Sequence, residues 1–413
     1  MNHNKTFCVM PWINISADPD GTIKPCCIST QYITKDNGEK YNLGNDRIED
    51  IVNSSDYVQL RNDMLAGKYV EGCSRCYNAE QAGDESTRRH MYNDRWLTNT
   101  ITQEKINQGS TIDTRVLDID LRFGNLCNLA CKSCNSLHSS QLAKELNELK
   151  DTDINNFYTI VDSPNINDWY QTETFEYNID SQLKNLSQLY ITGGEPTIIK
   201  KNYELLEKLV DSGRSKEMRI IINSNMTNLN QKFYSLISEF ENVTFYASID
   251  GHGSLQEYMR YPSNWEQIDK NLRYLIDNFD NITLKPSPVI QITNLNRIVE
   301  LFEYFENFNR LANKSIVSIL PINLQVPNHL DCTYLPLDYK KECWTKIEEW
   351  ISTATYQDSN FVKKMQIIKT KCFTDVDYRH QLDRYFQMND IFDNSRSFYL
   401  KDVNPELERF RLS

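Results

Sequence analysis

The chain has 413 residues, of which 39% are hydrophobic and 25% are charged, and its formal net charge is −12. This composition is typical of a globular protein with room for about two or three domains. The negative charge argues against non-specific affinity for nucleic acid or anionic lipid. No apolar stretch is long enough to span a bilayer, and the first residues lack the apolar core of a secretory signal. We therefore expect a cytoplasmic protein without a membrane segment.

The N-terminal region is distinguished by its cysteines. Cys8 is followed at a distance by the pair Cys26 and Cys27, and Cys73 and Cys76 have C-x2-C spacing. In a chain without a secretion signal, cysteines clustered in this way favour metal or cluster ligation over disulfides.

Two other features of this region concern helices. Tyr57, Leu60, Met64 and Leu65 share one face, which predicts a short helix over 55–65. The run 88–90 (Arg-Arg-His) is basic but is flanked by acidic residues, so we expect it on a solvated helix face and not in a phosphate site.

From residue 115 onward, apolar strands alternate with amphipathic helices, the pattern of a parallel α/β architecture. Six β/α units are too few for a closed eight-stranded barrel, and they are compatible with a partial (β/α)6 barrel. We expect strands at 116–123, 188–192, 218–223, 243–249, 282–292 and 315–320, and amphipathic helices at 265–279, 298–305 and 338–351.

These patterns divide the chain into four parts. The segment after the first barrel strand is longer than one helix requires, which indicates an insertion. We expect a cysteine-rich module at 1–95, a linker or surface helix at 96–114, an α/β barrel at 115–330 with an insertion at about 151–177, and a helical C-terminal extension at 331–413.

A loop with three cysteines follows the first barrel strand. Cys127, Cys131 and Cys134 have C-x3-C-x2-C spacing. Three thiolates around a [4Fe–4S] cluster leave one iron open to another ligand, which a catalytic cluster requires. The alternative is a zinc site, for which His138 could be the fourth ligand.

Further polar or glycine-containing turns follow the next strands. Glycine lets a ligand approach the backbone closely, and a hydroxyl and a carboxylate can both hydrogen-bond a ribose. The turns are Gly193-Gly194-Glu195-Pro196 after the second strand, Ile222-Asn-Ser-Asn225 at the end of the third, and Ser248-Ile-Asp250-Gly251 at the end of the fourth, with Arg260 further on.

Together the three-cysteine loop and the Gly-Gly-Glu-Pro turn resemble the core signature of radical S-adenosylmethionine (SAM) enzymes. The resemblance implies a partial (β/α)6 barrel that binds SAM at the open iron and cleaves it reductively to a 5′-deoxyadenosyl radical. For Arg260, placed by the resemblance near the cofactor carboxylate, a surface ion pair is the alternative. The other implied SAM contacts are Gly193, Gly194 and Glu195 near the methionyl amine, Ser248 and Asp250 near the ribose and methionyl portion, and Asn225, although Met226 replaces the glycine that relatives often carry next to it.

The N-terminal cysteines resemble half of a SPASM domain, the smaller version called twitch. In relatives this module holds an auxiliary [4Fe–4S] cluster and usually follows the barrel, whereas here it precedes it. Structural zinc is the alternative. The resemblance rests on the C-x17-C spacing, with Gly21 five residues before the second cysteine. It implies that the ligands are Cys8, Cys26, Cys73 and Cys76 and that Cys27 is a neighbour or an alternate ligand.

The resemblance also bears on function. We expect a radical SAM enzyme that receives electrons from an external flavodoxin- or ferredoxin-like donor and abstracts hydrogen from a peptide or peptide-like substrate. One alternative is a dehydrogenase of a small molecule, such as an aminosugar or alcohol. Another is a non-catalytic scaffold that binds metal. No residue is identified as a catalytic acid or base.

Overall fold

The computed structural model describes residues 4–411, except 82, 84, 85, 87, 162–167, 313–316, 325 and 356–358. The chain divides into two compact units, each described by itself. Unit 1 contains residues 1–125, 165–222 and 231–243, and unit 2 contains residues 126–164, 223–230 and 244–413.

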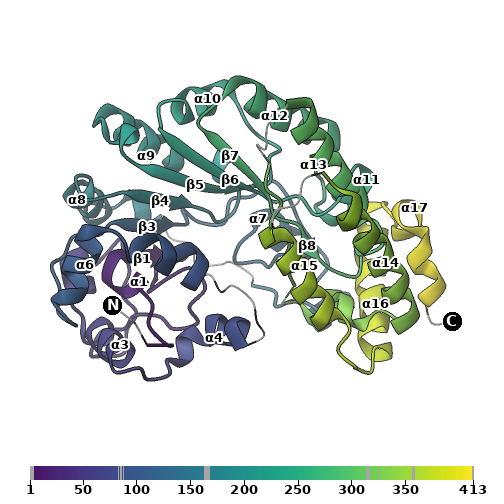
Figure 1. The fold of residues 1–413 in the computed structure, drawn as a ribbon, viewed down its shortest axis with the longest axis horizontal. Helices are drawn as coiled ribbons and strands as arrows, with labels where there is room; N and C mark the ends of the chain where they lie inside the picture. The colour runs from purple at the N-terminus through teal and green to yellow at the C-terminus, as the bar shows by residue number, and fades with distance from the viewer. Residues whose placement is uncertain are drawn as a thin grey trace. The chain divides into compact units, whose positions relative to one another are not determined.

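The central sheet has seven strands in the order β2-β1-β3-β4-β5-β6-β7 (Figure 1). Strands β3, β4 and β5 pair in parallel, as the α/β pattern predicts. The strands are β1 (Asn14–Ala17), β2 (Ile23–Lys24), β3 (Asp118–Leu121), β4 (Gln188–Ile191), β5 (Arg219–Ser224), β6 (Asn242–Ala247) and β7 (Ile282–Pro286).

The end of the sheet differs from the expected pair of long strands. The segment expected as one strand over 282–292 is divided into β7 and β8 (Val289–Ile290), because Pro286 and Pro288 have no N–H to continue a ladder. The expected sixth strand is a parallel bridge from Val317 to Leu284, followed by β9 (Ile322–Asn323), which pairs in parallel with β8. Residues 315 and 316 lie outside the described part of the chain.

Strand β1 belongs to the cysteine-rich module yet pairs in parallel with β3, the first barrel strand. Its register places Asn14 opposite Asp118 and Ser16 opposite Asp120. All four residues of β1 are buried. The sheet of unit 1 is therefore built jointly by the N-terminal module and the barrel, which the sequence patterns did not predict.

Helices cover the strands within each unit. The predicted helix over 55–65 is confirmed as α3, and α6 occupies part of the expected linker. The helices of unit 1 are α1 (Met10–Ile13), α2 (Ile48–Val52), α3 (Ser55–Leu65), α4 (Ser74–Gln81), α5 (Asp94–Trp96), α6 (Thr100–Asn107), α8 (Glu173–Gln182), α9 (Lys200–Asp211) and α10 (Gln231–Ile237).

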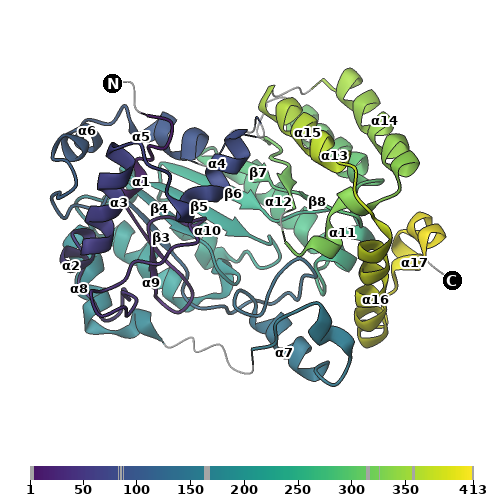
Figure 2. The same cartoon turned by 90° about the horizontal axis from the view of Figure 1, so that it is seen from below.

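In unit 2 the predicted helices are confirmed as α12, α13 and α14. Asn264 caps α12 by accepting from the Gln267 N–H, and a stripe of apolar side chains on this helix is buried. Helix α14 packs against α13 and α15, as Figure 2 shows. The helices of unit 2 are α7 (Ser140–Glu148), α11 (Ser254–Met259), α12 (Trp265–Asn278), α13 (Ile298–Ala312), α14 (Leu337–Thr353), α15 (Ser359–Cys372), α16 (Arg379–Arg396) and α17 (Leu400–Val403).

The C-terminal extension is helical, as expected, and consists largely of α14 to α17. Among the described residues, no helix combines the length and the apolar character needed to cross a bilayer. The residue boundaries proposed for the four parts of the chain stay a prediction.

Candidate functional site

The three-cysteine loop lies in unit 2 and is held by backbone hydrogen bonds. The Ala130 N–H donates to the Tyr261 carbonyl at 2.6 Å, and the Lys132 N–H donates to the Met259 carbonyl at 3.3 Å. The Ser139 hydroxyl donates to the Leu129 carbonyl at 2.6 Å and also caps α7. The loop is thus anchored to the end of α11, to the residues that follow it, and to the start of α7.

The three thiols of the loop are close enough to interact. Burial, with contributions from Cys131 and Cys127, raises the pKa of Cys134 to about 12. Burial also raises the pKa of Cys131, whereas the charges of Arg260 and Arg396 oppose that shift. Three soft sulfur donors at this spacing match what an iron–sulfur cluster binds, and ligation displaces their protons.

Arg260 and Asp250 form a buried ion pair beside this loop. Arg260 Nε donates to Asp250 Oδ2 at 2.8 Å, and Arg260 Nη1 lies 3.9 Å from Cys131 Sγ. Asp250 is fully buried, and its Oδ1 accepts from the Val289 N–H at 2.8 Å. The ion pair of Arg260 is therefore not a surface pair, and the Arg260 guanidinium faces the three-cysteine loop.

Ser248 and Asn225 are positioned by local hydrogen bonds in the same unit. The Ser248 N–H donates to the Ser224 carbonyl at 2.8 Å. Asn225 Nδ2 donates to Asn128 Oδ1 at 2.9 Å, which connects the third-strand turn to the cysteine loop. Met226 adopts φ +63°, a left-handed conformation that glycine adopts without strain.

The Gly-Gly-Glu turn lies in unit 1. Gly193 has φ +85°, and a Cβ there would lie 2.7 Å from the Cβ of Arg122, so only glycine fits. Gly194 also has positive φ, +56°. Glu195 is 1% exposed, and its Oε1 accepts from the Thr197 hydroxyl at 2.7 Å, so its carboxylate caps the short helical turn that follows.

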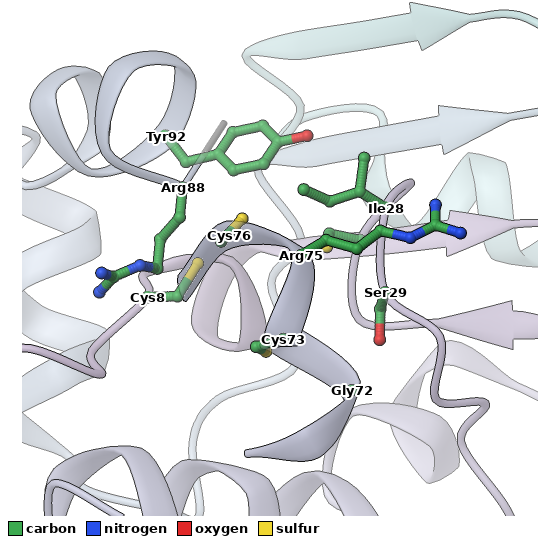
Figure 3. A pocket seen from close by; sticks show the side chains of 10 residues that line it. Cys8, Ile28, Ser29, Gly72, Cys73, Arg75, Cys76, Arg88 and Tyr92 are labelled. Atoms are coloured by element: carbon green, nitrogen blue, oxygen red, sulfur yellow. The ribbon is translucent and has the colours of Figure 1, made fainter. Parts of the chain in front are cut away.

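The four N-terminal cysteines assigned as ligands line one pocket in unit 1. Figure 3 shows Cys8, Cys73 and Cys76 around this pocket, and Cys26 also lines it. Burial raises the pKa of Cys8, and Cys73 and Cys76 raise it further, so the thiols interact. Four soft sulfur donors around one pocket match a closed iron–sulfur site.

Cys27 has a different environment from its neighbour Cys26. Its Sγ lies 3.2 Å from the Tyr92 hydroxyl, and it is absent from the residues that line the cysteine pocket. Burial raises the pKa of Cys27 to about 12, with Asp120 as the next contribution. This arrangement supports Cys27 as a neighbour of the site.

Arg88 corrects the expectation of a solvated basic face. Arg88 is 4% exposed and lines the cysteine pocket. The guanidinium forms an ion pair with Glu80 and donates to the carbonyls of Phe7 and Lys5. The flanking acidic residues suggested an exposed helix, but burial against the N-terminal backbone gives this guanidinium enough partners inside the protein.

A buried acidic face of β3 was missed by the sequence analysis. Asp118 and Asp120 are 2% and 4% exposed, and each has one carboxylate oxygen without a hydrogen-bond partner among the described residues. Asp120 forms an ion pair with Arg122 at 3.0 Å, and Arg122 also pairs with Asp18 at 3.3 Å. The alternation of charged and aliphatic residues over 118–122 is the signal that could have indicated this face.

Zinc and iron–sulfur sites place their thiolates differently. Four thiolates on one zinc ion lie about 3.8 Å apart, because each Zn–S bond is about 2.3 Å and the geometry is tetrahedral. Thiolates that hold the corners of a cubane stand farther apart. Within the described part of the chain, no group of three or more His, Cys, Asp or Glu side chains converges on a single-ion site. His138, the residue considered as a fourth zinc ligand, forms a hydrogen bond between its Nδ1 and Asn135 Oδ1 at 2.9 Å.

Comparison with known families identifies two domains in the chain. Residues 121–305 match the radical SAM superfamily, and residues 8–77 match SPASM, an iron–sulfur cluster-binding domain. The central domain belongs to the radical SAM superfamily. The SPASM-type module precedes it, as expected from the cysteine spacing. A radical SAM domain implies SAM and a [4Fe–4S] cluster, and the N-terminal SPASM match supports an auxiliary cluster.

Comparison with solved structures gives matches of low sequence identity and with TM-scores below 0.5. SuiB of Streptococcus suis bound to S-adenosylmethionine is 13% identical, with a TM-score of 0.36, and the match covers 85% of this chain and 69% of that one. The structure of the same protein bound to the precursor peptide SuiA is 13% identical, with a TM-score of 0.37 and coverages of 86% and 75%. Native anSMEcpe with bound AdoMet is 12% identical, with a TM-score of 0.30 and coverages of 67% and 61%. No curated protein matches the sequence.

Proposed function

We propose that Cys127, Cys131 and Cys134 hold the [4Fe–4S] cluster that binds SAM. When bound, this cluster supplies an electron to SAM, and the resulting 5′-deoxyadenosyl radical abstracts hydrogen from the substrate. The observation that carries the proposal is the buried Asp250–Arg260 pair beside Cys131, which places a fixed cation at the cluster loop. The electron comes from an external flavodoxin- or ferredoxin-like donor.

The chain's own residues position the cofactor in this proposal. Arg260 places its guanidinium where a cofactor carboxylate can pair with it, and Asp250 holds that guanidinium in place. Asn225 keeps the third-strand turn against the cysteine loop through Asn128. Ser248 offers a hydroxyl to the ribose. Residues 193–195 are proposed as further SAM contacts on the motif alone.

We infer that Cys8, Cys26, Cys73 and Cys76 hold the auxiliary [4Fe–4S] cluster. Four ligands close this cluster, because Cys27 is directed to Tyr92 and the other four line one pocket. A closed cluster favours electron transfer over direct ligation of the substrate.

The substrate is proposed to be a peptide or peptide-like molecule, because relatives with this module mostly modify peptides. The four-cysteine pocket also favours a second candidate, oxidation of a small aminosugar or alcohol, because a closed cluster can accept the second electron from a substrate radical. A product lighter by two hydrogens on a small molecule would support dehydrogenation, and a peptide of altered mass or stereochemistry would support maturation.

The decisive experiment measures SAM cleavage. We expect anaerobically reconstituted protein with dithionite to form 5′-deoxyadenosine, and Cys131→Ala to abolish it while keeping the auxiliary iron. Cys76→Ala is the matched control, which should lower the auxiliary iron and retain SAM cleavage without substrate. Wild-type protein that holds both clusters yet forms no 5′-deoxyadenosine would support the non-catalytic scaffold instead.

A further inference from the structure

Helix α16 of the C-terminal extension reaches the three-cysteine loop. Both belong to unit 2. Arg396 at the end of α16 contacts Ala130, and Asp393 one turn earlier contacts Lys132. These two loop residues lie on either side of Cys131, so the helix contacts the loop next to one proposed cluster ligand through the Ala130 carbonyl and the Lys132 side chain.

The first contact is a buried arginine fork. Arg396 Nε and Nη2 donate to the two carboxylate oxygens of Glu145 at 2.8 and 2.7 Å, and Nη2 also donates to the Ala130 carbonyl at 2.7 Å. The Arg396 side chain is 3% exposed and lies over the rings of Tyr261 and Phe392 at 4.7 and 4.4 Å. A bidentate pair held between rings leaves the guanidinium little freedom to move.

One nitrogen of this guanidinium is not used by the protein. Arg396 Nη1 is buried and has no hydrogen-bond partner in the part of the chain that the structure describes. A buried donor without a partner carries a desolvation cost that a sulfur or cofactor atom nearby would offset.

The second contact fixes the loop on the other side of Cys131. Lys132 Nζ donates to Asn389 Oδ1 at 2.7 Å and to Asp393 Oδ1 at 3.0 Å. The same ammonium lies 3.6 Å from the centre of the Tyr258 ring, and the Tyr258 hydroxyl donates to Asp393 at 2.8 Å. Lys132 is thereby neutralised by α16, whereas Arg396 keeps a nitrogen available.

We propose that Arg396 is a positioning residue that fixes the backbone at Cys131 and stabilises the reduced form of the SAM-binding cluster by its charge. This inference rests on the proposed function, namely that the three-cysteine loop holds a [4Fe–4S] cluster. Reduction adds one negative charge to a thiolate-bound cluster, so a fixed cation beside it favours the reduced state, and hydrogen bonds to sulfur act in the same direction. Glu145 opposes this effect, because it is the anion paired with the same guanidinium.

The test is the reduction potential of the SAM-sensitive cluster in the full-length holoprotein. The potential is measured by a redox titration followed by electron paramagnetic resonance, and the signal that changes on SAM addition identifies the cluster of the three-cysteine loop. For Arg396→Met we expect the ratio of reduced to oxidised cluster at a fixed potential to fall about tenfold, which corresponds to about 59 mV for a one-electron couple. Arg396→Lys, which retains the charge, should restore most of this ratio.

A second variant distinguishes charge from structure. Glu145→Gln removes the opposing anion while keeping an acceptor for Arg396, so the ratio of reduced to oxidised cluster at a fixed potential should rise. A purely structural role would move both variants in the same direction. The control is Arg379→Met, an exposed arginine at the start of α16, about 25 Å along the helix axis, which should leave the potential unchanged.

The possible results distinguish a failure of the Arg396 proposal from a failure of the proposed function. Opposite shifts for Arg396→Met and Glu145→Gln support the proposal. Equal potentials in all variants, or shifts of the same sign, overturn it while leaving the proposed function intact. If Arg396→Met does not accumulate, Glu145→Gln decides alone, and a ratio that stays equal or falls overturns the proposal. A wild-type protein without a SAM-sensitive cluster overturns both the proposal and the proposed function.

Discussion

Replacement of Asp118 by asparagine should change how stability depends on pH. Asp118 opens β3, is 2% exposed, and its Oδ2 accepts from Gln188 Nε2 at 3.0 Å. Burial raises its pKa from 3.8 to about 7; Asp120 adds to the shift, whereas the Gln188 hydrogen bond and the charge of Arg95 oppose it. The folded protein therefore favours the protonated carboxyl group.

The sign and size of the effect follow from this pKa. Because the folded pKa lies above the unfolded one, the stabilising contribution of protonation is complete below about pH 4 and is lost as the pH rises through about 7. The two pKa values differ by about three units, or about 4 kcal/mol in all. Between pH 5 and 8 the loss is on the order of 2–3 kcal/mol.

We expect Asp118→Asn to remove this dependence. Its free energy of unfolding should exceed that of the wild type by about 1–2 kcal/mol at pH 5 and by about 4 kcal/mol at pH 8, because the amide has no charge to bury. The measurement is urea unfolding of the reduced, cluster-free protein from pH 5 to 8, followed by tryptophan fluorescence. Asp338→Asn is the control, because the Asp338 side chain is 96% exposed. Parallel pH profiles of wild type and Asp118→Asn would refute the reasoning.

Three other predictions concern backbone shape, ligation and a buried cation. Gly193→Ala should lower the free energy of unfolding by about 1–3 kcal/mol, more than Gly213→Ala, because both have positive φ but only Gly193 would bring a Cβ within 2.7 Å of another carbon; urea unfolding of both variants compares them, and equal losses would contradict this. Cys27→Ala should keep the iron and sulfide content of the auxiliary site, whereas Cys76→Ala should lower it. Elemental analysis measures both variants, and loss of iron from Cys27→Ala would show that Cys27 is a ligand. Arg61→Met should cost about 3 kcal/mol or more in denaturant unfolding, because the 1% exposed arginine donates to three backbone carbonyls at 2.7 to 2.9 Å; a loss under about 1 kcal/mol would mean that water replaces it.

The barrel could be predicted from sequence because its signals are local. Alternation of apolar strands with amphipathic helices is a property of neighbouring residues, and it gave α12, α13, α14 and the first strands correctly. The strand predicted over 282–292 was wrong because prolines interrupt the ladder between β7 and β8. The cysteine sites were indicated by spacing, which reflects ligand chemistry and not packing.

Contacts between distant segments could not be predicted in the same way. Asp393 and Arg396 belong to a polar helix far along the chain, and nothing in their local pattern shows that they meet Ala130 and Lys132. The burial of Arg88 was missed for the same reason, because its carbonyl partners come from the first residues of the chain. Charged residues are expected at the surface, and only tertiary partners reveal the exceptions.

The parallel pairing of β1 with β3 has a consequence for how this protein can be divided. A chain that begins after the cysteine-rich module would leave one edge of β3 without its hydrogen-bonding partner, and an exposed edge of a buried strand is a template for aggregation. Ile15 and Ala17, which are fully buried, would also leave their places in the core. The module and the barrel should therefore fold as a cooperative whole, so that neither can be exchanged between proteins as an independent cassette.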